Sequence, residues 1–267
     1  RGMQMCSHET FMDCPYYEQL MYVGDTRLEA LTWYAMTADP RLPMRAVELF
    51  DWSRWSTGFV AERYPSDPYQ LSLTFSMLWV SMLRDFATWR AADGRWLRDR
   101  LTGVRCLLEH FAALPKHGGL LRGIPGWPFV DWVPDWFRGM PPDAEFGVSS
   151  PVNLLYAQAL LHAAEVEDIG GDARMAGRWR EDARDVGEKV FERFWDEERG
   201  LLADDESRTH FSEHAQCLAL INGLLEEPHR SRCIDGLLTA GDLARTTVYF
   251  RFYLFEALRL AGHCGAA

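Results

Sequence analysis

Residues 6–27 read CSHETFMDCPYYEQLMYVGDTR, and this stretch is the most informative part of the chain. It places Asp13, Glu18 and Asp25 close together, among aromatic residues and next to Arg27. Neighbouring carboxylates repel one another unless a cation or a shared proton stabilises them, and the stretch contains no lysine. These acids therefore predict a pocket for a polyhydroxylated or cationic ligand, or a site in which one carboxyl group stays protonated as a general acid.

The same residues resemble the signature of a known family. Asp-Cys-Pro-x-x-Glu followed by Gly-Asp is similar to the motif of the α-L-rhamnosidases of glycoside hydrolase family 78, whose fold is an (α/α)6 barrel. That motif usually has Arg before the Glu and Trp before the Gly-Asp, where this chain has Tyr17 and Tyr22, which argues against strict rhamnose specificity. The resemblance covers nearly the whole chain, through FDWSRW (50–55), ERYPS (62–66), FVDWV (129–133), FWDEERGLLADD (194–205), FSEHAQ (211–216) and TTVYFRFYLFEALRLAG (246–262).

The resemblance implies an enzyme without a cofactor that acts on a carbohydrate. The implied reaction is inverting hydrolysis of a terminal α-L-rhamnoside or a related neutral sugar. Glu18 matches the general acid of the family, and Asp13 and Asp25 match residues that bind sugar hydroxyls. In an inverting enzyme the second carboxylate activates a water, about 6.5–9.5 Å from the acid. The alternative for Glu18 is an ordinary acid in a loop or at a helix cap.

The residues around Glu18 favour the acid role on physical grounds. Tyr16, Tyr17 and Tyr22 are positioned in the sequence to desolvate Glu18, and the neighbouring acids add negative charge. Both effects raise a carboxyl pKa toward the range that a general acid requires.

Further side chains near helix ends and in loops are predicted to bind the sugar. Arg27 is expected to keep Asp25 or Asp13 ionised through a charge-assisted pair, with a surface salt bridge as the alternative. For the aromatic residues, packing in the helical core is the alternative. The predicted substrate-binding residues are Asp13, Tyr22, Asp25, Arg27, Trp52, Arg63, Tyr64, Trp127, Asp131, Trp132 and His214.

Helical periodicity dominates the rest of the chain and predicts an all-α fold. Apolar residues recur at spacings of three and four along 97–111, 152–163, 186–194 and 249–260. Helices are also expected near 26–37, 43–54, 70–91, 172–185, 213–225 and 229–239, with one short β-hairpin near 200–212. Sequential helices of this length predict helical hairpins, and the resemblance predicts a single (α/α)6 toroid over 1–267, incomplete at its C-terminal end.

One segment interrupts this pattern. Residues 115–148 contain six prolines and several glycines together with Trp127, Trp132 and Trp136, which is too much proline for a helix and too much tryptophan for a solvated linker. Long ordered loops are usually functional, so we expect this one to line the mouth of a binding site, with Asp131 set between two aromatic residues. The alternative is a loop that only covers the end of the helical core.

Composition excludes several functions. The net charge of −11 argues against nucleic-acid binding, which requires a basic surface. The sequence contains no run of eighteen apolar residues, so no membrane-spanning helix is predicted. Six cysteines without metal-ligand spacing are expected to be reduced, buried thiols of a cytoplasmic protein. His210 and His214 have the i, i+4 spacing of paired metal ligands, but no HExxH motif surrounds them, so no metal is predicted.

The general base is the missing partner in this sequence. In the family it follows the helix that 246–262 resembles, and Glu256 is rejected because it lies inside that helical run. Asp131 and Glu145 are the only substitutes in these residues, so we expect little hydrolysis by the chain alone. Two hypotheses remain at this point: a glycosidase catalytic domain, or a non-catalytic carbohydrate-binding domain. An incomplete toroid would also expose apolar faces and favour a homo-oligomer.

Overall fold

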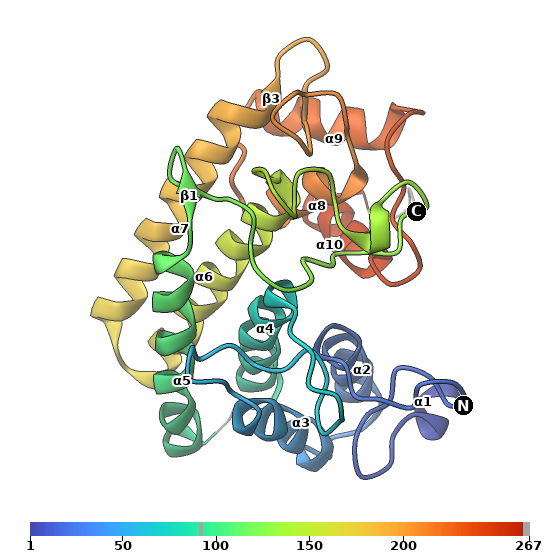
Figure 1. The fold of residues 1–267 in the computed structure, drawn as a ribbon, viewed down its shortest axis with the longest axis vertical. Helices are drawn as coiled ribbons and strands as arrows, with labels where there is room; N and C mark the ends of the chain where they lie inside the picture. Colours follow the sequence, from blue (N-terminus) through green and yellow to red (C-terminus); the bar gives the residue numbers. More distant parts are fainter. Residues whose placement is uncertain (91–92, 264–267) are drawn as a thin grey trace. The chain divides into compact units, whose positions relative to one another are not determined.

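The computed structural model describes residues 1–90 and 93–263. The part of the chain that it describes is mostly helical, with two small hairpins (Figure 1). The helices are α1 (Gly2–Met5), α2 (Val23–Met36), α3 (Arg41–Trp52), α4 (Leu73–Arg90), α5 (Gly94–Ala113), α6 (Ser150–Gly170), α7 (Ala173–Phe194), α8 (Glu213–Ile221), α9 (His229–Thr239) and α10 (Arg251–Leu260), with one 3-10 turn at Phe137–Gly139. The predicted all-α class is confirmed.

The chain forms two compact units that are discontinuous in sequence. Unit 1 contains Arg1–Ala113 and Ala159–Arg180, and unit 2 contains Leu114–Gln158 and Glu181–Ala267. Helices α6 and α7 each begin in one unit and end in the other. The expectation of a single domain over residues 1–267 stays a prediction.

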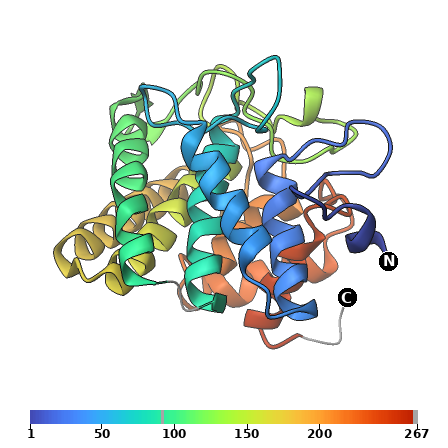
Figure 2. The ribbon, with the colours of Figure 1, turned by 90° about the horizontal axis from the view of Figure 1, so that it is seen from below.

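Unit 1 is built around α4. Helix α2 packs along α4, and α3 packs against both, as Figures 1 and 2 show. Most side chains of α4 are buried on all sides, including Trp79, whose indole Nε1 donates to the carbonyl of Val47 at 3.2 Å. Helices α3 and α5 instead keep one polar, exposed face. This contrast between a buried helix and amphipathic neighbours is the pattern expected when inner helices are covered by outer ones.

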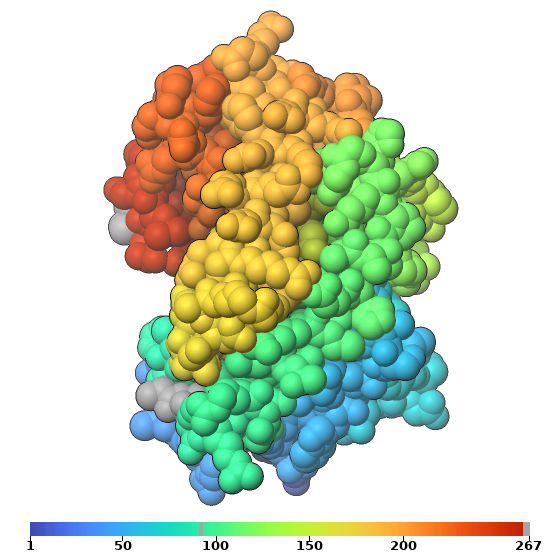
Figure 3. All heavy atoms as spheres, turned by 90° about the vertical axis from the view of Figure 1, so that its left-hand side faces the viewer, coloured from blue at the N-terminus to red at the C-terminus, as the bar shows by residue number. Residues whose placement is uncertain are grey.

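Helix α7 shows the amphipathic pattern over its whole length. Its buried residues recur every three or four positions from Met175 to Phe194, while charged residues such as Arg184 and Glu188 face solvent. Figure 3 shows this outer face as the band from yellow to orange. The sequence had predicted helices near 172–185 and along 186–194, and the structure joins them into one helix because no breaker separates them.

Unit 2 contains α8, α9 and α10. Helix α8 packs against α10 and α9, and almost every residue of α8 is buried. Its N-terminus is capped by Ser212, whose side chain accepts a hydrogen bond from the N–H of Ala215 at 3.4 Å. A serine in this position satisfies a backbone donor that would otherwise be unpaired.

The hairpins differ in position from the expected one. Strands β3 (Trp195–Asp196) and β4 (Leu201–Leu202) form a hairpin whose turn is closed by the N–H of Gly200 donating to the carbonyl of Asp196 at 2.8 Å. The hairpin therefore overlaps only the start of the predicted 200–212 segment, because Gly200, with φ of +66°, makes the turn earlier. A second hairpin, β1 (Lys116–His117) with β2 (Leu120–Leu121), lies inside the proline-rich segment, where no strand was expected.

Two remaining sequence expectations concern cysteines and membranes. Cys217 and Cys233 are buried free thiols, as expected, whereas Cys6, Cys14 and Cys106 are only half-buried. Cys264 lies outside the described residues. Among the helices that the structure describes, none combines the length and apolar character needed to span a bilayer.

Candidate active site

The motif that opens the chain forms a closed loop in unit 1. The N–H of Asp13 donates to the carbonyl of Leu20 at 2.9 Å, and the N–H of Leu20 donates to Asp13 Oδ1 at 2.9 Å. Glu18 lies exposed within this loop, next to Gln19, whose φ is +54°. The two hydrogen bonds of Asp13 therefore hold together the two ends of the loop that contains Glu18.

A short bridge joins this loop to the segment 62–64. The N–H of Val23 donates to the carbonyl of Glu62 at 3.0 Å, and the N–H of Tyr64 donates to the carbonyl of Met21 at 3.1 Å. Between these bonds, Arg63 Nη1 donates to the hydroxyl of Tyr22 at 2.8 Å. Burial and a hydrogen bond with the Glu18 side chain raise the pKa of Tyr22, although Arg63 opposes the shift. The structure thus brings Glu18, Tyr22 and Arg63 together.

The expected desolvation by tyrosines is wrong for two of the three. The side chains of Tyr16 and Tyr17 are 78% and 86% exposed and contact each other edge to face, with ring centroids 5.1 Å apart. Pro15 starts an exposed turn here, so both rings extend into solvent instead of covering Glu18. Only Tyr22 is half-buried beside it.

Strongly raised pKa values occur instead on acids at the start of α2 and beside it. Burial, with added repulsion from Asp13 and Glu18, raises the pKa of Asp25 to about 6. Burial, with repulsion from Asp25 and Asp13, raises the pKa of Glu29 to about 9. Burial also raises the pKa of Glu62 to about 7, against the opposing effect of Arg63. These acids can hold protons near neutral pH, which is a property common in catalytic sites.

Sequence reasoning missed Glu29 and Glu62. Glu29 follows Asp25 by one helical turn, a spacing that places both on one face of α2. Glu62 lies in the ERYPS motif, is 1% exposed and has one buried carboxyl oxygen, Oε2, without a hydrogen-bond partner. The i, i+4 spacing from Asp25 could have identified Glu29 as a site residue. No comparable spacing in the sequence indicates that Glu62 is a site residue.

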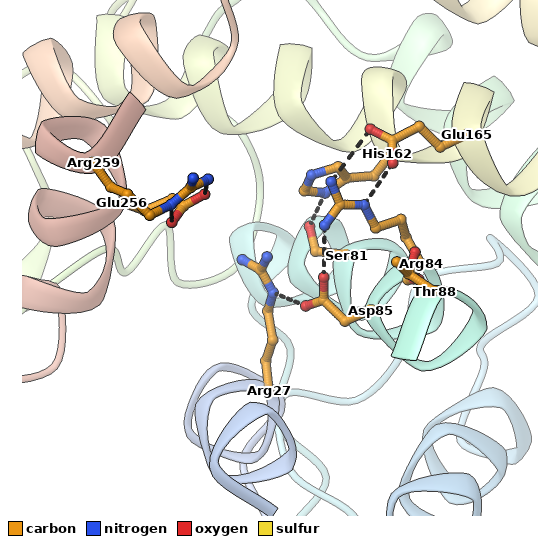
Figure 4. A network of polar contacts seen from close by, with 9 residues as sticks. All are labelled: Arg27, Ser81, Arg84, Asp85, Thr88, His162, Glu165, Glu256 and Arg259. Atoms are coloured by element: carbon orange, nitrogen blue, oxygen red, sulfur yellow. Dashed lines mark hydrogen bonds and ion pairs between the residues drawn. The ribbon is translucent and has the colours of Figure 1, made fainter. Parts of the chain in front are cut away.

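Arg27 has a partner in α4 that the sequence did not predict. Its Nε donates to Asp85 Oδ2 of α4 at 2.8 Å, and both side chains are buried. Asp85 also accepts from Arg84 Nη1 at 3.0 Å, and Arg84 Nε contacts Glu165 Oε2 at 2.7 Å (Figure 4). Arg27 therefore takes part in an ion-pair network with residues of α4, because Asp85 lies on the face of α4 that packs against α2. Its expected pairing with Asp25 or Asp13 stays a prediction.

The two other predicted residues of unit 1 lie at the surface. Trp52, at the end of α3, is 69% exposed. Tyr64 is half-buried, and its backbone N–H takes part in the bridge to Met21. Trp52 is therefore free of core packing, which was the alternative explanation for it.

In unit 2, Asp131 forms a buried clasp between three segments. Asp131 Oδ2 lies 2.8 Å from His214 Nε2 at the start of α8 and accepts from the N–H of Thr247 at 2.8 Å. Asp131 Oδ1 accepts from the N–H of Trp132 at 2.9 Å and from the hydroxyl of Thr247. Burial alone would raise the pKa of Asp131, but the bonds from His214 and Thr247 lower it. The carboxylate is thus held ionised and ties the proline-rich loop to α8.

Next to the clasp, three aromatic rings form a cluster. Trp127, Phe129 and Trp132 lie with ring centroids 5.0–5.7 Å apart, and Trp132 is 61% exposed. The indole Nε1 of Trp127 donates to the carbonyl of Arg138 at 2.9 Å. A fixed, exposed indole face of this kind is suited to stacking on the C–H face of a sugar ring.

His210 and His214 do not act as a pair. His214 contacts Asp131, whereas His210 Nδ1 lies 3.2 Å from Asp205 Oδ2. Over residues 1–90 and 93–263, no cluster of three or more His, Cys, Asp or Glu side chains has an arrangement that could hold a metal ion.

The predicted site residues are thus divided between the units. Unit 1 brings together Asp13, Glu18, Tyr22, Asp25 and Arg63, and unit 2 brings together the Asp131 clasp and the tryptophan cluster. That the proline-rich loop around Asp131 lines the mouth of a binding site stays a prediction.

The buried and amphipathic helices define an all-α domain. The sequence profile described as the bacterial alpha-L-rhamnosidase 6 hairpin glycosidase domain matches residues 1–245. The chain belongs to this family.

Solved structures show the same fold. A family 78 rhamnosidase of Bacillus sp. GL1 is 23% identical, with a TM-score of 0.89 over 98% of this chain and 27% of its own. A rhamnosidase from Klebsiella oxytoca with rhamnose bound is 19% identical, with a TM-score of 0.85 over 99% of this chain and 51% of its own. An alpha-L-rhamnosidase from Dictyoglumus thermophilum is 16% identical, with a TM-score of 0.77 over 99% of this chain and 30% of its own.

The chain therefore spans between about a quarter and a half of the length of these proteins. No curated protein sequence matches it.

Proposed function

We propose that this domain carries the general acid of an inverting glycosidase that releases a terminal α-L-rhamnose or a related neutral sugar. Glu18 is the proposed acid, and Asp13 and Asp25 bind sugar hydroxyls. The observation that carries the proposal is the arrangement of Glu18 in a loop closed by Asp13, beside the Tyr22–Arg63 pair. Membership of the rhamnosidase family supports the choice of sugar.

The chemistry of each residue fits this proposal. An exposed carboxyl group on a fixed loop can reach the oxygen of a leaving group. The half-buried hydroxyl of Tyr22, held by Arg63, limits the orientation of the Glu18 side chain. Trp127, Trp132 and Trp52 are proposed to stack on sugar rings, and Tyr64, Asp131, His214 and Arg27 to support the site.

The test is replacement of Glu18 by Gln. We expect Glu18→Gln to fold normally and to lower turnover of rhamnosides with poor leaving groups by about 10²–10⁴, the scale of a positioned general acid. Rhamnosides with activated aryl leaving groups should lose much less, because their departure needs little protonation. Equal losses for both substrate types would reject the acid role.

The assay also separates the two hypotheses drawn from the sequence. Binding of rhamnose without turnover, unchanged by Glu18→Gln, would favour a non-catalytic carbohydrate-binding domain. A general base at Asp131 or Glu145, self-association and a cytoplasmic location stay predictions.

A further inference from the structure

Unit 2 contains a cavity of about 410 Å³. All the residues that line it belong to unit 2, so none comes from the Glu18 loop, and they include the candidate base Glu145. One wall is the loop 135–147, and the other is formed by Asp205 and His210. Trp136 contributes to the lining and packs against His214, with ring centroids 4.6 Å apart. The volume is that of a small-molecule site, since ligand pockets usually measure about 300–1,000 Å³.

Both walls are held in place by hydrogen bonds. Asp205 Oδ1 accepts from the N–H groups of Thr209 and His210 at 3.1 and 2.9 Å, and Asp205 Oδ2 accepts from the hydroxyls of Ser207 and Thr209. On the other wall, the N–H of Gly147 donates to the carbonyl of Asp143 at 2.9 Å. A cavity with fixed walls loses little conformational entropy when a ligand binds.

Two aromatic side chains of the cavity are exposed to solvent. Phe137 and Phe146 line it and are 71% and 77% exposed. Phe137 belongs to a short 3-10 turn and Phe146 to the following loop, so neither ring is needed for the core. Exposed apolar rings beside a cavity mark a ligand-binding surface, and their flat faces can pack on the C–H face of a sugar.

The charges of the lining select against anions. Asp135, Asp143, Glu145 and Asp205 carry carboxyl groups, and His210 is the one basic side chain among the lining residues. Burial raises the pKa of a carboxyl group, but hydrogen bonds from Ser207, His210 and Thr209 lower that of Asp205 to about 2, so it is ionised. Carboxylates accept hydrogen bonds from sugar hydroxyls and repel a uronate or a phosphate.

We propose that this cavity is a second carbohydrate-binding site, formed wholly within unit 2, that takes a neutral saccharide between Phe137, Phe146 and the carboxylates. The choice of a saccharide as ligand rests on the proposed function. The site itself rests on the cavity, its fixed walls and its exposed rings.

Binding can be observed at the two rings directly. The full chain is prepared with fluorinated phenylalanine, and the resonances of residues 137 and 146 are assigned with Phe137→Ala and Phe146→Ala. The probe is α-L-rhamnopyranosyl-(1→6)-D-glucose, titrated into wild type and into Glu18→Gln. We expect both resonances to shift saturably in both proteins, and the double Phe→Ala variant to bind about tenfold more weakly by calorimetry.

The matched control is Phe255→Ala, which removes an exposed aromatic ring of the same unit outside this cavity. It should leave the affinity unchanged. The analogue α-L-rhamnopyranosyl-(1→4)-D-glucuronic acid should bind several-fold more weakly at low salt, and Asp135→Asn/Glu145→Gln should reduce that difference.

Unshifted resonances at saturating disaccharide would overturn the proposal of a second site. If rhamnosides are nevertheless hydrolysed, the proposed function survives. Conversely, shifted resonances together with equal losses for both leaving-group types in Glu18→Gln would support the site and remove the proposed function. Equal affinity for the neutral and the acidic disaccharide would reject the charge selection.

Discussion

Asp13 and Leu20 are joined twice, because each donates its backbone N–H to an oxygen of the other, at 2.9 Å in both cases. One of those bonds uses the Asp13 side chain, so this carboxyl group helps to close the Glu18 loop. In this chain the spacing from Asp13 to Glu18 then has a mechanical role beside any contact with sugar.

Replacement of Asp13 tests that mechanical role. Asp13→Ala removes the acceptor for Leu20 and should destabilise the protein by about 0.5–1.5 kcal/mol, the usual net value of one hydrogen bond. Asp13→Asn keeps an acceptor oxygen and should lose much less. Urea unfolding of both variants measures the difference, with Glu9→Ala as an exposed control. Equal losses for Ala and Asn would mean that the charge, and not the hydrogen bond, matters.

The buried acids of unit 1 should make the protein less stable in alkali. The folded-state pKa values of Asp25, Glu62 and Glu29 are raised to about 6, 7 and 9. A group with a raised pKa contributes fully below its unfolded pKa, near 4, and this contribution is lost as the pH rises through the folded value. We therefore expect the melting temperature to fall between pH 5 and pH 9.

A neutral isostere should reduce that dependence. Over this range Glu62→Gln should lose less free energy of unfolding than wild type, by about 2–3 kcal/mol, because the pKa of Glu62 is raised from 4.5 to about 7 and one pKa unit corresponds to about 1.4 kcal/mol. The exposed Glu198→Gln serves as control. The measurement is urea unfolding at several pH values. An identical pH dependence in Glu62→Gln would show that Glu62 is ionised in both states.

The clasp at Asp131 should be important for stability. Asp131→Ala leaves the buried donors of His214, Thr247 and Trp132 without an acceptor, and a buried donor left without its partner costs about 1–3 kcal/mol. Asp131→Asn retains one acceptor oxygen and should cost less. Calorimetric melting compares the two with Asp135→Asn, an exposed acid four residues away. A loss below about 1 kcal/mol for Asp131→Ala would contradict a structural role.

Two glycines should respond in opposite ways to alanine. A Cβ at Gly139, where φ is +72°, would lie 2.5 Å from Phe129 Cε2 and 3.0 Å from the carbonyl of Asp131. Gly139→Ala should therefore destabilise by at least about 1 kcal/mol. Gly177, inside α7, has open space around its Cβ position, and Gly177→Ala should stabilise by about 0.5–1 kcal/mol. Thermal unfolding of the pair settles both signs.

The helices were predictable because their signal is local. The spacing of apolar residues along 97–111 lies within α5, and Ser149 with Pro151 marks the start of α6. The sequence predicts the hairpin a few residues beyond its true position, because the turn depends on one glycine, Gly200. The polar residues that suggested a later turn form a loop whose backbone donates hydrogen bonds to Asp205.

The site was predictable only in part because its electrostatics are not local. The motif identified Asp13, Glu18 and Asp25, but the neighbours that decide their environment come from elsewhere in the chain. Glu62 reaches the site through a backbone bridge, and Arg27 is held by Asp85, 58 residues away. Sequence spacing alone cannot show which tyrosine covers an acid and which extends into solvent.

Because the units are discontinuous in sequence, they limit the order in which the chain can fold during synthesis at the ribosome. Unit 1 needs residues 159–180 to be complete, so it cannot close until the long loop 115–148 of unit 2 has already emerged. No cut in the chain separates the units without also dividing α6 or α7. A gene fragment that ends near residue 113 would leave the buried faces of α4 and α5 without their remaining partners, and should be recognised by chaperones and proteases as unfinished.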